Sequence, residues 1–431
     1  MTALKISRAW TKQIFFTLTE HGAIRVLDAL TTLILIRVLS AHDFGLFSVY
    51  QSGVAMALLF FPAIEIALFR DYSRLKREGT LAVELAVYRY FNYLKLAALV
   101  VLIFAISLVP QEAPWLVRVG LLSFAFALPF SQAFYSFMRE PLRFEMRQHI
   151  VSLVGIAQRA LLVLTLVILS RLAPNNVPLL LFAALGTYIA AGWGWWFTSR
   201  EFFVGMPLVP EKAYAKIKKA FFHIVLWIHL GGVITQVIQT LDVFSLNVFN
   251  VDLAEIGRYG IALKAANFFQ ILPIALASSF GVYLARNHTK EERQKETSRV
   301  LKYSMLFIVL TFGLFILGMA VGKPLLAFLA KGKLEAESLA RTTEYFRWQL
   351  AGVLILCAGY PLTTYLAIRG SLAKLFFQAG LPWLVLSGAV YFWSASHGVL
   401  VAAKANVLVA SANIALHAFY YFRRRASDIA R

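Results

Sequence analysis

The chain has 431 residues, of which 60% are hydrophobic and 15% are charged, and its formal net charge is +20 at pH 7. A soluble globular domain is roughly half apolar and a quarter charged, so this composition excludes a soluble protein and predicts an integral membrane protein. The Lys and Arg residues lie mostly in short loops between apolar stretches, which favours orientation in a membrane over nucleic-acid binding. The single cysteine, Cys357, excludes a disulfide framework.

About twelve apolar stretches are long enough to cross a bilayer, for which a helix needs about 20 residues. We expect all of them to be helices, because only helices and closed barrels satisfy the backbone in lipid and these runs are too long for barrel strands. In chain order the predicted spans are 15–36, 44–69, 91–109, 118–138, 150–170, 179–198, 221–246, 259–284, 303–322, 347–368, 375–395 and 400–421.

Basic residues gather after every second span and at both chain ends. The richest loops are 70–77, 139–147, 212–219, 286–299 and 369–374. By the positive-inside rule these loops and both termini face the cytoplasm. The predicted outward loop 323–346 departs mildly from the rule, because it contains three lysines and an arginine, although three glutamates accompany these bases.

The two halves of the chain carry similar local patterns. The segment 42–47 (HDFGLF), between the first two spans, and the segment 254–259 (AEIGRY), between spans seven and eight, share the order acidic, apolar, Gly, any residue, aromatic. Six spans per half would enter the membrane from the same side, which predicts parallel repeats. The predicted domains are an N-terminal six-helix lobe at 1–198, a basic cytoplasmic linker at 199–220 and a C-terminal six-helix lobe at 221–431.

Polar residues in the first span share one face of a helix. Thr17, His21, Arg25, Asp28 and Thr32 follow at spacings of four, four, three and four. Ionisable groups at the bilayer centre cost at least about 2.5–3.5 kcal/mol each, and they normally face a partner or a wet cavity. This face is therefore a cavity wall, on which Arg25 contacts an anionic substrate and Asp28 tunes it or takes part in ion coupling. Alternatively, Arg25 and Asp28 form a buried pair that fixes helix packing.

Further polar residues lie in other spans. The predicted substrate-binding cations are Arg25, Lys264 and Arg159. The predicted ion-coupling or cavity-lining groups are Asp28, His21, Asp242, His229, Gln236, Gln239 and Asn267. No nucleotide-binding G-x-x-x-x-G-K-[ST] segment or clustered metal spacing is present in the sequence. We therefore expect a transporter rather than an enzyme, with no cofactor and with H⁺ or Na⁺ as the candidate coupling ion.

The segment 35–47 (LIRVLSAHDFGLF) resembles the first hairpin of the bacterial Wzx-type flippases, which are polysaccharide-biosynthesis membrane proteins of the multidrug/oligosaccharidyl-lipid/polysaccharide (MOP) exporter superfamily. The segment 252–262 (DLAEIGRYGIA) is similar to their equivalent second-half segment. The resemblance implies an all-α, MATE-like fold of two six-helix lobes around a central cationic cavity, in the bacterial inner membrane. It implies alternating access that flips an undecaprenyl-pyrophosphate-linked oligosaccharide to the periplasmic leaflet for O-antigen (lipopolysaccharide), capsule or exopolysaccharide assembly, with the polysaccharide polymerase among the partners.

Two other functions stay open at this point. A cation-coupled multidrug exporter of the MATE type shares the two-lobed plan, but it needs cavity carboxylates for cationic drugs. A scaffold for envelope polysaccharide assembly would have the same membrane spans but would not transport a substrate.

Overall fold

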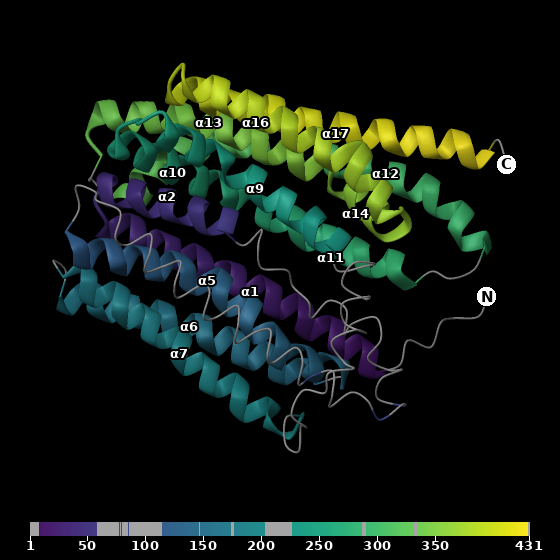
Figure 1. Ribbon diagram of the computed structural model, residues 1–431, viewed down its shortest axis with the longest axis horizontal. Coiled ribbons are helices and arrows are strands. Elements are labelled where there is room, and N and C mark those ends of the chain that lie inside the picture. Colours follow the sequence, from purple (N-terminus) through teal and green to yellow (C-terminus); the bar gives the residue numbers. More distant parts are fainter. Residues whose placement is uncertain are drawn as a thin grey trace. The chain divides into compact units, whose positions relative to one another are not determined.

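The computed structural model describes residues 8–57, 77, 79, 85, 114–145, 147–173, 176–202, 226–286, 290–331 and 334–429. Within these ranges every regular element is a helix (Figure 1). The predicted all-α class is confirmed.

The first half of the chain contributes long helices that coincide with predicted spans. They are α1 (Arg8–Val38), α2 (Ala41–Ala57), α5 (Trp115–Phe144), α6 (Gln148–Leu172) and α7 (Val177–Ser199), followed by the short turn η2 (Arg200–Phe202). The predicted span 91–109 and the second part of span 44–69 lie outside the described residues.

The second half contains helices that are interrupted by short breaks. They are α9 (Leu226–Val248), α10 (Leu253–Asn267), η4 (Phe268–Gln270), α11 (Ile271–Arg286), α12 (Lys290–Ala330), α13 (Ala336–Ala358), α14 (Tyr360–Arg369), α15 (Leu372–Leu375), η5 (Phe376–Gly380), α16 (Leu381–Ala395) and α17 (Val399–Ile429). Pro273, Pro361 and Pro382 each lie within the first three residues of the helix that follows a break. Proline lacks a donor N–H, so it fits the first turn of a helix and disfavours an uninterrupted one.

The predicted outward loop 323–346 is wrong. Helix α12 continues through Pro324 to Ala330, and α13 begins at Ala336. Lys331 has a positive φ of 45°, the left-handed conformation that commonly ends a helix. Glu335 is the N-cap residue of α13 and Glu337 lies in its first turn, where the positive end of the helix dipole favours acidic side chains.

The helices are those of a multi-pass membrane protein. Among the described residues, six are long and apolar enough to cross a membrane, and counting the bent pair α13–α14 as one span gives seven. Two further apolar helices, Trp115–Ala127 and Val237–Val248, are shorter.

The chain divides into two compact units. One comprises Met1–Ile34 and Ala57–His229, and the other comprises Leu35–Met56 and Leu230–Arg431. In the first unit α7 packs against α5 and α6, and in the second α13 packs against α10, α12 and α17 (Figure 1). Residues 35–56, which belong to the predicted N-terminal lobe at 1–198, pack with the second unit in this division, and the predicted lobe bounds stay predictions. Most of the predicted linker 199–220 lies outside the described residues.

Helix α7 begins with a side-chain cap that can be tested directly. Asn176 Oδ1 accepts a hydrogen bond from the Leu179 N–H at 3.1 Å. We expect Asn176→Ala to lower the free energy of unfolding by about 1 kcal/mol, because one N–H of the first turn loses its acceptor. Asn176→Asp keeps an acceptor and should retain the wild-type thermal midpoint in detergent. Equal midpoints for the alanine and aspartate variants would contradict the capping role.

Candidate functional site

An ion pair between a buried arginine and a half-buried aspartate ties together helices of the first unit. Arg159 Nε on α6 lies 3.0 Å from Asp28 Oδ1 on α1, and the two side chains are 5% and 32% exposed. Nε–H has no hydrogen-bond acceptor with adequate geometry among the described residues. The Nε–carboxylate contact is therefore mainly electrostatic.

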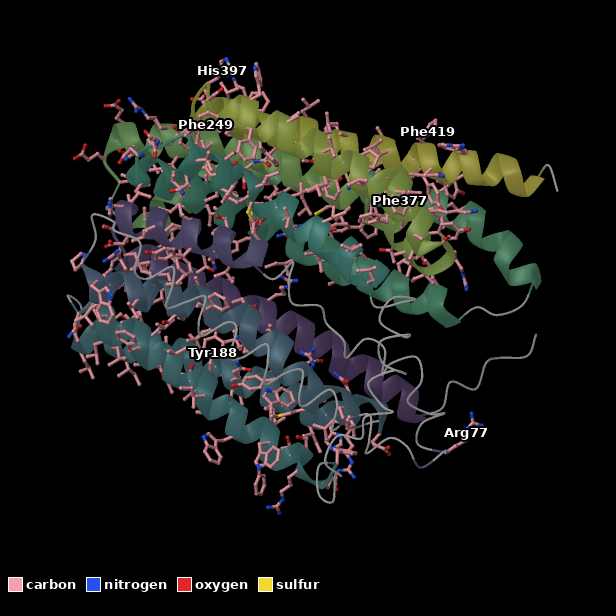
Figure 2. All side chains as sticks on the ribbon, viewed as in Figure 1. Arg77, Tyr188, Phe249, Phe377, His397 and Phe419 are labelled. Atoms are coloured by element: carbon pink, nitrogen blue, oxygen red, sulfur yellow. The ribbon has the colours of Figure 1, made fainter. Side chains whose placement is uncertain are left out.

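Two tyrosines extend this pair to the neighbouring helices. Arg159 Nη1 donates to the Tyr188 hydroxyl at 3.3 Å, and the guanidinium lies 5.7 Å from the Tyr188 ring centroid. Tyr188, labelled in Figure 2, is buried on α7, and its main-chain carbonyl accepts a 2.6 Å hydrogen bond from the Tyr135 hydroxyl of α5. The first network thus connects α1, α5, α6 and α7.

The second unit contains a network around a different carboxylate. Asp242 on α9 is 2% exposed, and its Oδ2 accepts a 2.6 Å hydrogen bond from the Tyr259 hydroxyl of α10. Asp242 Oδ1 accepts from the main-chain N–H of Val243 at 2.7 Å. Both contacts come from neutral donors.

Amide side chains carry the second network to three more helices. Asn406 Nδ2 on α17 donates to the Tyr259 hydroxyl at 2.9 Å and to Gln349 Oε1 on α13 at 2.6 Å. The Tyr391 hydroxyl on α16 donates to Asn406 Oδ1. Gln349 is fully buried, and its Nε2 has no partner among the described residues. The network therefore joins α9, α10, α13, α16 and α17.

The two networks differ in the group that balances the negative charge of the carboxylate. Asp28 has the guanidinium of Arg159 beside it. The partners of Asp242 among the described residues are hydroxyl, amide and main-chain groups, and none of them is basic. Burying a charged carboxylate without a basic partner costs free energy. Uptake of a proton or a cation removes most of that cost. Only the second network therefore presents a carboxylate that lacks an internal countercharge within the described part of the chain.

The structure brings together two of the predicted residues, Asp28 and Arg159. Arg25 is exposed on α1, Gln239 is exposed on α9, and Asp242 is buried three residues further on. Lys264 and Asn267 are both half-buried on α10. The roles assigned to these side chains stay predictions.

Three other predicted residues are placed only through their backbone. His21 belongs to α1, and His229 and Gln236 belong to α9. Their side chains lie outside the described part of the structure.

Sequence reasoning missed most of the neutral members of both networks, with Asn406 the exception. The missed members are Tyr135 and Tyr188 in the first, and Tyr259, Gln349 and Tyr391 in the second. One signal was available for Tyr259, because it is the aromatic residue of the second repeated segment. Tyrosines in apolar helices are otherwise indistinguishable from core or interfacial aromatics.

A third, more exposed cluster surrounds Glu255 near the start of α10. Glu255 Oε1 pairs with Arg258 at 2.9 Å and with Arg341 of α13 at 3.3 Å. Glu255 Oε2 accepts from the Tyr345 hydroxyl at 3.0 Å. This carboxylate, unlike Asp242, is balanced by two arginines.

Comparison with solved structures identifies the fold. No protein-family model and no curated protein matches the chain. An inward-facing multidrug resistance MATE family transporter of the MOP superfamily superposes with a TM-score of 0.71 and 15% identity, covering 94% of this chain and 95% of the other. The lipid II flippase MurJ in an inward closed conformation gives 0.71 and 14% identity, covering 95% and 87%.

A third neighbour is a MOP superfamily transporter from Pyrococcus furiosus Vc1 (DSM3638), with a TM-score of 0.58 and 13% identity over 97% and 96% of the two chains. Its binding pocket is described as having reverse polarity, which suggests a different function for it. Identities at this level show the fold alone. The chain therefore has the fold of MOP superfamily transporters, represented here by a MATE family transporter and a lipid II flippase.

Proposed function

We propose that this protein is a secondary transporter that flips an undecaprenyl-pyrophosphate-linked oligosaccharide from the cytoplasmic to the periplasmic leaflet by alternating access. It would act in the bacterial inner membrane, with both termini in the cytoplasm, in the assembly of O-antigen, capsule or exopolysaccharide. The polysaccharide polymerase is the partner that we expect to receive the product. The repeated hairpin segments and the shared fold with a lipid II flippase support this proposal.

The charge arrangement on α1 is the observation that favours an anionic substrate. Asp28 is paired with Arg159, whereas Arg25, three residues earlier, is exposed. A cationic drug would require an available carboxylate on this face, and the carboxylate here already has a guanidinium beside it. A pyrophosphate headgroup requires positive charge along its path, which Arg25 and Lys264 would supply.

We assign ion coupling to the second network. Asp242 is fully enclosed by neutral donors, so uptake of a cation would relieve the cost of its charge. A proton is the better candidate than Na⁺, because Asp242 Oδ2 and Asn406 Oδ1 already accept hydrogen bonds from Tyr259 and Tyr391. Few oxygen atoms would then be left to replace the hydration shell of a metal ion.

Loss of a substrate-binding cation provides the test of the main proposal. We expect Arg25→Ala and Lys264→Ala each to slow flipping of a lipid-linked pyrophosphate oligosaccharide in proteoliposomes by about 10- to 100-fold, the typical value of a charge-assisted contact. Complementation of a flippase-deficient strain should fall in parallel. Arg25→Lys should retain most of the activity, since the charge is kept.

Matched controls separate the pathway from the overall charge. Arg171→Ala on α6 and Lys302→Ala on α12 remove exposed cations elsewhere and should transport at the wild-type rate. Wild-type flipping by stably inserted Arg25→Ala and Lys264→Ala variants would exclude the cationic pathway. A deletion strain with increased drug susceptibility and normal surface polysaccharide would instead favour the multidrug exporter. A protein that supports polysaccharide assembly but does not flip lipid in proteoliposomes would favour the scaffold.

A further inference from the structure

The two repeated sequence segments pack directly against each other in the second unit. A Cβ added to Gly45 on α2 would lie 1.8 Å from the Leu253 carbonyl oxygen, and one added to Gly257 on α10 would lie 1.8 Å from the Ala41 carbonyl oxygen. Each glycine thus meets the residue four positions before the other glycine. The helices cross with a local two-fold relation that mirrors the duplication in the sequence.

Only glycine permits this crossing. Any side chain at either position would force the backbones apart by more than about 1 Å, since carbon atoms rarely approach a carbonyl oxygen within 3.0 Å. The close contact continues one turn further on, where a Cβ at Gly260 would lie 2.6 Å from Ser48 Oγ. Small residues that bring two backbones together are a common means of helix association in membranes.

The segment that carries Gly45 has an unusual position in the chain. Leu35–Met56 packs with the second unit, while the residues directly before and after it pack with the first. At its beginning, the Arg37 guanidinium lies 4.7 Å from the Phe328 ring centroid and donates to the Phe328 carbonyl at 3.2 Å. The segment is therefore covalently continuous with residues of the first unit, but its packing contacts are with the second unit.

We propose that the Gly45–Gly257 crossing is a gate, in which Leu35–Met56 docks on the second unit in one state of the transport cycle and leaves it in the other. This inference rests on the proposed alternating-access function. The crossing is backbone against backbone, so it closes tightly and can separate without breaking an ion pair between the two glycine positions. Both segments adjoin loops predicted to face outward, which assigns the gate to the periplasmic end. Packed interfaces of this kind have two discrete arrangements rather than a continuum.

A disulfide across the crossing tests the gate. Ser48 and Gly260 are in direct contact across the crossing, since a Cβ at Gly260 would lie 2.6 Å from Ser48 Oγ, so Ser48→Cys with Gly260→Cys in a Cys357→Ala background should cross-link on oxidation. We expect the cross-link to reduce flipping by about tenfold or more, because it holds one of the two states. Reduction should restore the rate seen before oxidation.

A second disulfide serves as the control. Gly120→Cys and Leu181→Cys join α5 to α7 inside the first unit, where the Cβ atoms would be 3.3 Å apart. This cross-link should leave transport unchanged. If the oxidised, cross-linked Ser48→Cys/Gly260→Cys variant flips lipid as fast as the same variant after chemical reduction, the gate is overturned.

A labelling measurement makes the inference independent of the substrate and of the Gly260 variant. Ser48 and Ser245 are both at least 94% buried in the second unit. If the crossing opens, a single Ser48→Cys should react with a membrane-impermeant maleimide about tenfold faster than a single Ser245→Cys, because only the former is uncovered. Equally slow reaction of both would overturn the gate. Fast labelling of Ser48→Cys without flipping of any lipid-linked oligosaccharide would refute the proposed substrate and leave the gate intact.

Discussion

Replacing Asp242 with asparagine is expected to abolish the dependence of transport on an ion gradient while the protein stays folded. In the coupled mechanism, the carboxylate takes up the driving ion, and an amide of the same shape cannot. We expect the rate with an imposed proton gradient to fall by about 5- to 150-fold, the range of coupling free energies between linked sites. The measurement is flipping in proteoliposomes with and without a proton gradient, and with a Na⁺ gradient as a separate arm.

The stability of Asp242→Asn distinguishes coupling from a purely structural role. Removing a buried carboxylate that has no basic partner among the described residues should leave the thermal midpoint unchanged or raise it. If Asp242 served only as a hydrogen-bond acceptor for Tyr259, the amide would be expected to lower the midpoint and to keep the ion dependence.

Glu255→Gln provides the matched control for this variant. This carboxylate lies in the same unit but is paired with Arg258 and Arg341. It should lose some stability and keep the gradient dependence. The same loss of coupling in both variants would contradict the assignment to Asp242.

Unlike Asp242→Asn, a variant that breaks the ion pair of the first unit should be clearly less stable than the wild type. The loss of stability should depend on which of the two partners is replaced. Asp28→Asn leaves the Arg159 guanidinium, 5% exposed, without its carboxylate, and we expect a loss of about 3–5 kcal/mol. Arg159→Gln leaves a carboxylate that is 32% exposed and can be hydrated, so the loss should be about 1–2 kcal/mol.

The double variant completes the test of the pair. Asp28→Asn with Arg159→Gln removes both charges, so it should be more stable than Asp28→Asn alone, and the coupling is read from a double-mutant cycle of denaturation free energies. Additive losses would show that the two side chains do not depend on each other. Tyr135→Phe loses one hydrogen bond to the Tyr188 carbonyl and should cost only about 1 kcal/mol.

The fold was largely predictable because lipid imposes a strong constraint on the sequence. The predicted spans 118–138, 150–170 and 179–198 each fall inside one observed helix, since about 20 apolar residues in lipid have few alternatives to a helix. The error at 323–346 arose where lysines and glutamates interrupt the apolar pattern. The charged residues there lie near the end of α12 and in the first turns of α13, not in a long loop.

The candidate site was only partly predictable, for a different reason. Spacing along α1 placed Asp28 on a polar face of the first span, but periodicity along one helix contains no information about the partner on another. Arg25 is three residues away, yet the arginine found beside Asp28 is Arg159, more than a hundred residues along the chain. The packing of residues 35–56 on the second unit could not be predicted for the same reason. The two glycines indicate that another backbone comes close, but they do not show which helix it belongs to.

The length of α12 has a practical consequence. At 41 residues it is about 60 Å long, twice the hydrocarbon thickness of about 30 Å, and its apolar part begins only at Val300. Its first ten residues therefore extend the spanning helix as a continuous polar rod. A small soluble domain fused in helical register to that rod would be held rigidly on the second unit, and would give images of single particles the asymmetric landmark that a bare membrane bundle lacks.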